Sequence, residues 1–313
     1  MVVALLAGGT GGAKLAAGLR DILHGTDGFP AIEPGELHVI ANTGDDIEIY
    51  HSYVSPDPDL ITFRLAGVLN DAGFGIEGES HDEMNRRRAA GEEIWFQLGD
   101  DDLTVCRERA ELLAAGSSLT EAHRKATAAY DTGGARVLPM SDAPVRTVVV
   151  TPDGERRLQE YLIRDRSEPA IESVRVTPDA GPAPTAPAVL EALERADLVV
   201  IGPSNPVISI DPILKTAGLL EAIDAPLIAV SPFVGGEVLK GPTAKFLTAA
   251  GAAPNPQGAL DFLQAATGGA IDGFVGDEPV TGIAHHLTDV RMSDTDEQRK
   301  VAAEVIRYGR SFQ

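Results

Sequence analysis

Four aspartates near the start of the sequence have the chemistry to hold a metal ion or to accept a proton. Asp45 and Asp46 close the segment Asn-Thr-Gly-Asp-Asp at 42–46, and Asp57 and Asp59 follow in a short stretch rich in Pro and Ser. Magnesium prefers hard oxygen ligands and commonly takes one or two carboxylates together with substrate phosphate and water. Aspartate is also common in turns, where its side chain satisfies backbone donors. Both interpretations stay open at this stage.

A glycine-rich segment upstream of these aspartates is suited to binding phosphate. The sequence Gly-Gly-Thr-Gly-Gly-Ala-Lys at 8–14 directly follows an apolar run, which predicts a tight turn from a strand into a helix. Glycines leave backbone N–H groups uncovered, and a helix N-terminus carries partial positive charge. The spacing is neither a full P-loop nor a clean dinucleotide fingerprint, and such a turn needs glycine anyway. The candidate phosphate-binding residues are Gly9, Thr10, Gly11, Gly12 and Lys14.

Two later loops have the composition expected of a nucleotide-binding wall. Gly-Pro-Ser-Asn-Pro at 202–206 places a Ser-Asn pair between prolines that fix the backbone, so the polar side chains can hydrogen-bond a base or a ribose. After Ser-Pro-Phe-Val at 231–234, Gly-Gly at 235–236 and Lys-Gly-Pro at 240–242 form another loop of the same kind, which is consistent with a second wall. A purely structural turn is the alternative. The candidate residues are Ser204, Asn205, Pro206, Ser231, Gly235 and Gly236.

The single tryptophan, Trp95, begins the segment Trp-Phe-Gln-Leu-Gly, which runs into three consecutive carboxylates at 100–102. An aromatic platform suits a flat heterocycle by stacking. Alternatively, Trp95 and Phe96 pack this segment onto the core, and the aspartates start a helix whose dipole favours them. His51 is notable for its nearness to the acidic clusters, although a histidine satisfied within the core is the commoner situation.

The elements that must position these residues alternate along the chain. Four short apolar runs are expected to be strands buried on both faces: Val2–Ala7, Leu37–Ala41, Leu198–Gly202 and Leu227–Val230. Each of these strands is followed by one of the loops described above. Strands alternating with helical stretches predict an α/β fold, a Rossmann-like doubly wound and mainly parallel sheet with a helical insertion. Open α/β sheets bind ligands at the carboxyl ends of their strands, where the candidate loops lie.

The predicted organisation is a nucleotide-binding core interrupted once. Residues 1–64 and 136–313 are expected to form the Rossmann-like core, and residues 65–135 a mainly helical insertion with helices at 82–91, 107–115 and 119–130. Asp-Gly between two β-rich runs predicts a hairpin at 146–163. The insertion is expected to help form a pocket with the core.

The composition and net charge limit which cellular compartments and binding partners suit this protein. The 313 residues carry a formal net charge of −21, which disfavours nonspecific binding to nucleic acid or to anionic membranes. A phosphorylated substrate would therefore need local help from backbone N–H groups, a divalent cation or a few basic residues. Cys106 is the only cysteine, so an internal disulfide is excluded and a reducing compartment fits. With no membrane-length apolar run and no basic leader, the protein is expected in the cytoplasm.

The motifs together resemble the 2-phospho-L-lactate transferase family of coenzyme F-420 biosynthesis. The similarity covers nearly the whole chain and lies in an ordered set: the segments at 8–14, 42–46, 202–206 and 231–236 quoted above, with Pro-Asp-Pro-Asp at 56–59, Trp-Phe-Gln-Leu-Gly-Asp at 95–100, Leu-Pro-Met-Ser-Asp at 138–142 and Gln-Glu-Tyr at 159–161. Each motif alone is modest support, but their common order makes chance similarity hard to sustain.

The resemblance implies a homodimer whose glycine loop and segments 202–206 and 231–236 hold the guanosine diphosphate (GDP) part of a donor, either guanylylated phospholactate or guanylylated phosphoenolpyruvate. The acceptor would be the 8-hydroxy-5-deazaflavin alcohol Fo, and guanosine monophosphate (GMP) would leave. Asp45 and Asp59 match the family's acidic positions near the deazaflavin and Mg2+, and are the implied catalytic and metal-binding residues. The implied deazaflavin contacts are Asp46, His51, Asp59, Trp95, Gln97, Asp100 and Met140.

The chain departs from the family pattern at several positions. Leu60 and Asp101 stand where the family commonly has Thr and Arg, Gln97 where some relatives have Lys, and Cys106 where a His is often found. These departures indicate altered substrate contacts.

Two other functions remain as alternatives. A nonenzymatic nucleotide-sugar-binding regulator resembling gluconeogenesis factor would keep the glycine loop but need no deazaflavin pocket, and the Trp95 segment argues against it. A nicotinamide dehydrogenase would use an acidic residue after the second strand to grip ribose, a role that Asp45 could mimic, but would leave the later loops unexplained.

Overall fold

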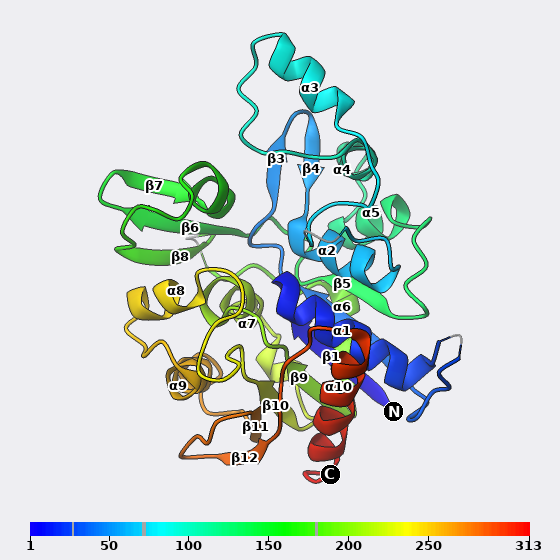
Figure 1. The fold of residues 1–313 in the computed structure, drawn as a ribbon, viewed down its shortest axis with the longest axis vertical. Coiled ribbons are helices and arrows are strands. Elements are labelled where there is room, and N and C mark those ends of the chain that lie inside the picture. Colours follow the sequence, from blue (N-terminus) through cyan, green and yellow to red (C-terminus); the bar gives the residue numbers. More distant parts are fainter. Residues whose placement is uncertain (27, 71–72, 179–180) are drawn as a thin grey trace.

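The computed structural model describes residues 1–26, 28–70, 73–178 and 181–313. At its centre is a seven-stranded sheet with the order β12-β11-β10-β9-β1-β2-β5, in which all neighbouring strands are parallel (Figure 1). The strands are β1 (Val2–Ala7), β2 (Glu36–Ala41), β5 (Arg136–Pro139), β9 (Leu198–Ile201), β10 (Leu227–Val230), β11 (Gly273–Gly276) and β12 (Ala284–Leu287). The expected α/β fold with a parallel, doubly wound sheet is confirmed.

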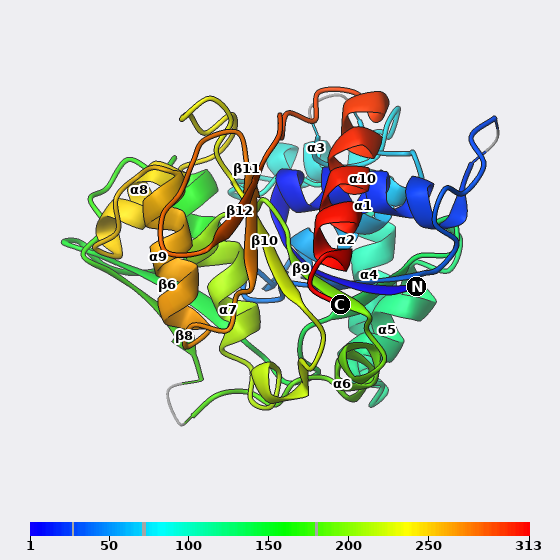
Figure 2. The ribbon, with the colours of Figure 1, turned by 90° about the horizontal axis from the view of Figure 1, so that it is seen from below.

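Helices cover both faces of this sheet, as the view in Figure 2 shows. On one face α1 (Gly9–His24), α2 (Pro56–Leu65) and α10 (Thr295–Arg310) pack against Leu5 and Val200. On the other face α6 (Pro187–Glu194), α7 (Asp211–Leu214) and α9 (Pro256–Ala266) pack against Leu6 and Ile201. Alternate residues of one strand thus enter opposite cores, which explains why the central strands are apolar throughout.

The strand order changes direction at β1, and this creates the crevice in which ligands of such sheets bind. The chain runs from β1 to β2 and β5 on one side, whereas β9 to β12 extend on the other. The loops that follow β1 and β9 lie next to each other at this crevice. Ser204 in the β9 loop connects them, because its Oγ donates to the Gly8 carbonyl at 2.7 Å and accepts from the Gly8 N–H at 3.2 Å.

The segment between α2 and β5 is mainly helical, and residues 71–72 within it lie outside the described residues. It contains α3 (Asp82–Ala89), α4 (Asp100–Ala114) and α5 (Leu119–Ala126), and it packs on a hairpin of β3 (Ile47–Ile49) and β4 (Ser52–Val54) at the top of Figure 1. Helix α4 begins seven residues before the predicted helix at 107–115. Its first turn is formed by the three aspartates at 100–102, whose charges favour a helix N-terminus.

A small antiparallel sheet lies beside the main one and contains the Asp-Gly turn. It consists of β6 (Arg146–Thr151), β7 (Gly154–Arg157) and β8 (Ser173–Thr177). The second arm is shorter than the run predicted up to residue 163, because a π-helical turn, η1 (Glu160–Arg164), follows β7. The remaining elements are η2 (Pro206–Ile210), η3 (Leu220–Ala222) and α8 (Thr243–Ala249). Within the described ranges, every helix is too short or too polar to cross a membrane.

Candidate functional site

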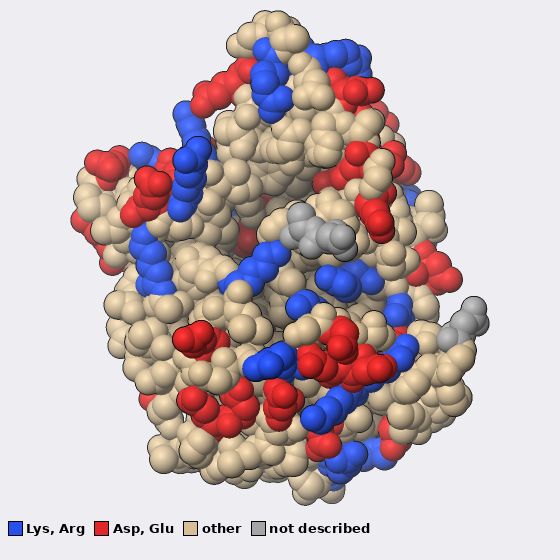
Figure 3. Space-filling view, in the orientation of Figure 1, with Lys and Arg blue, Asp and Glu red and all other residues tan. Residues whose placement is uncertain are grey.

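A cavity of about 870 Å³ opens at the carboxyl ends of the central strands, between the core and the helical segment. Figure 3 shows a hollow on this face with Lys and Arg side chains at its margin. The walls bring together the glycine loop, the acidic segments, the Trp95 segment and both later loops. Sequence-predicted residues on the walls are Gly9, Thr10, Gly11, Lys14, Asp45, Asp59, Trp95, Gln97, Ser204, Asn205 and Ser231.

The glycine loop forms the edge of this cavity where β1 passes into α1. Gly9 has a φ of 59°, which favours glycine. A Cβ at Gly11 would lie 2.1 Å from the Pro203 carbonyl oxygen, so this position admits no side chain without moving the β9 loop. The loop thus sets the N-terminus of α1 against the cavity, where its dipole favours an anion.

A pair of buried carboxylates lies beneath the glycine loop. Asn42 Nδ2 donates to Asp45 Oδ1 and to Asp57 Oδ2, at 2.9 Å each, and the Gly9 N–H donates to Asp57 Oδ1 at 2.6 Å. Burial raises the pKa of Asp45, and the nearby Asp57 raises it further. Burial also raises the pKa of Asp57, to about 6, although Asn42 and Gly9 oppose the shift. Both carboxylates line the same cavity as the glycine loop.

Asp59 has a different environment, because it is held by a buried arginine from α4. Arg109 Nη1 donates to Asp59 Oδ2 at 3.0 Å, and its Nη2 donates to Asp59 Oδ1. The same Nη1 also donates to the Tyr53 carbonyl at 2.9 Å. Burial raises the pKa of Asp59, and the Arg109 charge opposes that effect. His123 lies 3.8 Å from Asp59, and burial and then Arg109 hold its pKa well below the usual value, so the ring is neutral at pH 7.

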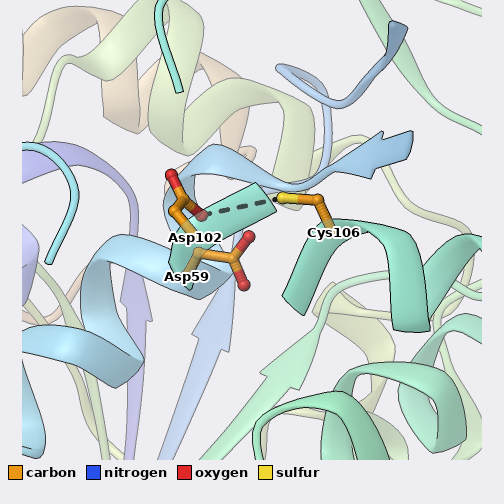
Figure 4. Close-up of side chains that lie close together, drawn as sticks. All are labelled: Asp59, Asp102 and Cys106. Carbon is orange, nitrogen blue, oxygen red and sulfur yellow. Dashed lines mark hydrogen bonds between the residues drawn. The ribbon is translucent and has the colours of Figure 1, made fainter. Parts of the chain in front are cut away.

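Asp59, Asp102 and Cys106 bring potential metal-ligating atoms within 4.8 Å of one another (Figure 4). The Cys106 thiol lies 3.6 Å from Asp102 Oδ1, and burial followed by the Asp102 charge raises its pKa. A soft, protonated thiol does not suit magnesium, and the guanidinium of Arg109 already neutralises Asp59 there. The carboxylate oxygens that fit magnesium best are those facing the cavity: Asp45, and the remaining lone pairs of Asp59.

Several predicted site residues lie elsewhere than on the cavity wall. His51 is exposed at the turn between β3 and β4, and Met140 is fully buried in the core. Asp46 is buried and accepts from Ser55 Oγ at 2.8 Å. Asp100 caps α3, since it accepts from the backbone N–H groups of Asp82 and Glu83. Gly12, Pro206, Gly235 and Gly236 belong to the wall loops without lining the cavity.

Asp57 is one of the four aspartates that the sequence singled out, and its contacts with Asn42 and Gly9 distinguish it from a turn aspartate. Other residues of the site were missed by sequence reasoning. Arg109 is one of several charged residues in α4, and its complete burial is not visible in the sequence. Phe74 also lines the cavity, from a segment without a motif, whereas Lys240 belongs to the 240–242 loop that the sequence indicated.

Comparison with known proteins indicates the family to which the chain is similar. Residues 2–306 match the family model described as 2-phospho-L-lactate transferase CofD. A 2-phospho-L-lactate transferase of Methanocorpusculum labreanum is 36% identical, over 98% of this chain and 99% of that protein. One of Halobacterium salinarum is 35% identical over 95% and 94%. A phosphoenolpyruvate transferase of Thermobifida fusca is 34% identical over 98% and 97%.

Solved structures with the same fold are more distant in sequence. The crystal structure of a UPF0052 family member from Bacillus halodurans superposes with a TM-score of 0.63 at 17% identity, covering 97% of this chain and 99% of that one. At this identity the likeness shows the fold alone.

Proposed function

The chain belongs to the 2-phospho-L-lactate transferase family, and on that basis we propose the reaction that its cavity supports. It transfers a phospholactyl-type group, phospholactyl or enolpyruvyl phosphate, from a GDP-linked donor to the deazaflavin alcohol Fo and releases GMP, in the biosynthesis of coenzyme F-420. The carrying observation is that the glycine loop, Asp45 and Trp95 line one cavity of about 870 Å³. That volume is in the range of small-molecule sites.

The donor's GDP part is assigned to the glycine-loop side of the cavity. The N-terminus of α1 favours the phosphates, while Ser204, Asn205 and Ser231 line the adjoining wall for the nucleoside. Asn205 has a free side-chain amide, because its Oδ1 caps η2 whereas its Nδ2 has no partner among the described residues. An unpartnered amide donor at this wall suits a base or ribose oxygen.

Asp45 and Asp59 are proposed as the residues that hold Mg2+, with Asp45 the more available. Asp45 Oδ2 has only a long contact of 3.5 Å with Gln159 Nε2, whereas Arg109 occupies both oxygens of Asp59. When bound, the ion would neutralise phosphate oxygens that gain charge during transfer. Arg109 fixes the direction of the Asp59 carboxylate and favours its ionised form against the effect of burial.

The proposed step is the transfer of the phospholactyl-type group to the ribityl hydroxyl of Fo. The ribityl hydroxyl oxygen of Fo attacks the phosphorus that carries the three-carbon group, a new P–O bond forms, and the P–O bond to GMP breaks. The hydroxyl proton must pass to a base. We assign this step to Asp45, through a carboxylate oxygen that the metal does not engage, because Asp45 faces the cavity. The family resemblance is also the basis for proposing a cytoplasmic homodimer.

A titration with fluorescent Fo, with and without GDP and magnesium, tests this function. We expect saturable micromolar binding that Trp95→Ala weakens at least tenfold, because Trp95 lines the cavity and offers a stacking surface. Trp95→Phe should retain most of the affinity, and GDP binding should be unchanged in both variants. Absence of Fo binding under every condition would refute the proposal and favour a nucleotide-sugar-binding regulator.

A further inference from the structure

One wall of the cavity has no part in the proposed binding of GDP or magnesium. The segment 159–167 contributes four residues to this wall: Gln159, Leu162, Ile163 and Ser167. Two of these side chains are apolar, and the other two carry neutral groups that both donate and accept hydrogen bonds. Gln159 Nε2 lies 3.5 Å from Asp45 Oδ2, so the wall begins beside the residue assigned to the reacting hydroxyl. An uncharged wall at that place suits a neutral, polar part of a ligand.

Ser167 lies in a turn whose backbone conformation is unfavourable for a residue with a Cβ. The φ angles of Arg166 and Ser167 are 53° and 57°, both in the left-handed region. Glycine adopts this region readily, whereas a Cβ there is crowded against the backbone. Such strain persists only where the surrounding structure enforces it, and it is often found at functional sites. The turn must therefore be held by contacts with its neighbours.

Lys245 from α8 and Tyr161 from η1 hold this turn. Lys245 Nζ donates to the Ser167 carbonyl at 2.5 Å and to the Pro169 carbonyl at 2.7 Å. The Tyr161 hydroxyl donates to the same Pro169 carbonyl at 2.8 Å, and the Ser167 N–H donates to the Tyr161 carbonyl at 2.8 Å. The Ser167 hydroxyl, by contrast, has no hydrogen bond among the described residues. The backbone of Ser167 is thus fixed, while its hydroxyl stays available at the cavity wall.

We propose that the 159–167 wall binds the polyhydroxylated ribityl chain of the acceptor, with Ser167 and Gln159 as specificity-determining residues. This inference rests on the proposed function, because it assigns one part of Fo. The ribityl chain joins the flat heterocycle, for which Trp95 offers a stacking surface, to the hydroxyl that reacts beside Asp45. Its other hydroxyl groups are neutral donors and acceptors, and a serine hydroxyl and a glutamine amide match them.

The ribose of the donor nucleotide is the other source of neighbouring hydroxyl groups. The acceptor is favoured because the wall begins at Asp45, where the acceptor hydroxyl reacts, whereas the nucleoside is assigned to the wall that contains Asn205. Leu162 and Ile163 offer apolar contact to the carbon atoms of the ribityl chain. The two sources share the same hydrogen-bonding chemistry, so the test must separate them.

Binding measurements on the purified protein separate the two sources without any turnover. Fo and an Fo analogue with a methyl group in place of the ribityl chain are titrated by fluorescence, and GDP by calorimetry. Ser167→Ala is expected to weaken Fo binding about fivefold, the effect of losing about one neutral hydrogen bond. The Kd values of the methyl analogue and of GDP should stay within about twofold of wild type. Gln159→Met should act in the same direction, because it keeps the length of the side chain but loses the amide.

Glycine variants separate the hydroxyl from the strained backbone. Ser167→Gly and Arg166→Gly each remove a Cβ at positive φ, so each is expected to raise the melting temperature by about 2 °C. Only Ser167→Gly should also weaken Fo binding, to the level of Ser167→Ala. Arg166→Gly is the matched control, since Arg166 is exposed and does not line the cavity. An equal loss of Fo affinity in Arg166→Gly would show that the shape of the turn, and not the hydroxyl, determines binding.

Other outcomes overturn the assignment as well. Ser167→Ala protein that binds Fo like wild type would remove Ser167 from the site. An equal loss of affinity for the methyl analogue would assign Ser167 to the heterocycle, and a selective loss of GDP affinity would assign it to the donor ribose. These results contradict the ribityl site alone, because wild-type binding of Fo still supports the transferase function. Wild-type protein that binds no Fo would refute the proposed function, and this inference with it.

Discussion

Arg109 from α4 and Asp59 from α2 form a bidentate ion pair beside the cavity, with one of the two contacts at 3.0 Å between Nη1 and Oδ2. The Arg109 side chain is completely buried. Two elements separated by 50 residues are therefore joined by a charged contact that water does not screen. The pair links the helical segment to the acidic side of the site, so folding of that segment and orientation of Asp59 are coupled.

Arg109→Gln is expected to lower the free energy of unfolding by about 3–5 kcal/mol, the usual result of removing one partner of a buried ion pair. The loss arises because Asp59 is left as a buried carboxylate without its cation. Chemical denaturation at pH 7 measures it, with Arg124→Gln on the surface of α5 as the control. A change below about 1 kcal/mol would show that the pair contributes little.

Asp59→Asn would also destabilise the protein, because it leaves the buried Arg109 charge without its carboxylate. Loss of activity in that variant would therefore not distinguish a catalytic role of Asp59 from a role in folding. Asp45 offers the cleaner test because no cation is bound to it. Its hydrogen-bond partners are Asn42 and Gln159.

Asp45→Asn is expected to reduce magnesium-dependent turnover at least a hundredfold, while the melting temperature stays equal or rises. The amide keeps the shape of the side chain but can neither hold the cation nor take the proton, and it removes a buried carboxylate whose pKa burial and Asp57 raise. Turnover and thermal unfolding are measured on the same sample, with Asp153→Asn in the exposed β6–β7 turn as the control. Turnover within threefold of wild type would remove Asp45 from the mechanism.

The sequence predicted most of what depends on local pattern. The runs at Val2–Ala7 and Leu227–Val230 are strands with those same bounds. A short continuous apolar segment that is followed closely by glycine or proline is typical of a buried strand. The strand β12, with exposed His285 at the edge of the sheet, was not predicted, since it is short and polar. The sequence offered a helix start at the aspartates 100–102 as an alternative to a ligand-binding role, and α4 does begin at Asp100. Negative charges in the first turn of a helix interact favourably with its dipole.

The site was predictable only where glycine, proline or aspartate occupy a strand end. Asp45 and Ser204 could be placed near each other because parallel strands end at one edge. The burial of Arg109 depends on how α2 packs against α4, and no local sequence pattern records that. The exposed position of His51 had the same cause, since the β3–β4 hairpin turns it away from the acidic cluster it follows.

Gly11→Ala is expected to abolish GDP binding and to lower stability by about 2 kcal/mol or more, as overpacked contacts do. The new Cβ would lie 2.1 Å from the Pro203 carbonyl oxygen, so the loops after β1 and β9 must separate. Calorimetry with GDP and thermal unfolding measure the two effects. Gly91→Ala is the control for GDP binding alone: its φ of +89° makes alanine strained and lowers stability too, but a Cβ added there would meet no atom within 4 Å. Wild-type GDP affinity in Gly11→Ala would contradict the assigned phosphate site.

Asp46 gives a prediction for pH, because burial raises its pKa from 3.8 to about 7 despite the opposing charge of Arg146. Its carboxyl is buried, and hydrogen bonding from Ser55 and Tyr53 opposes the rise in pKa only in part. A carboxyl with a raised folded pKa binds its proton more tightly in the native state, so its contribution to stability is present at low pH and is lost as pH rises from about 4 to 7.

Asp46→Asn is therefore expected to stabilise the protein at pH 8 relative to wild type, by up to about 4 kcal/mol, and to have little effect at pH 4. The amide cannot ionise, so it avoids the buried charge and keeps the acceptor for Ser55. Because other groups titrate in the same range, the quantity to measure is the difference in free energy of unfolding between variant and wild type, from denaturant curves at pH 4, 6 and 8. A difference that is constant across this range, or that falls as pH rises, would show that Asp46 is ionised in the native protein and that Arg146 outweighs burial.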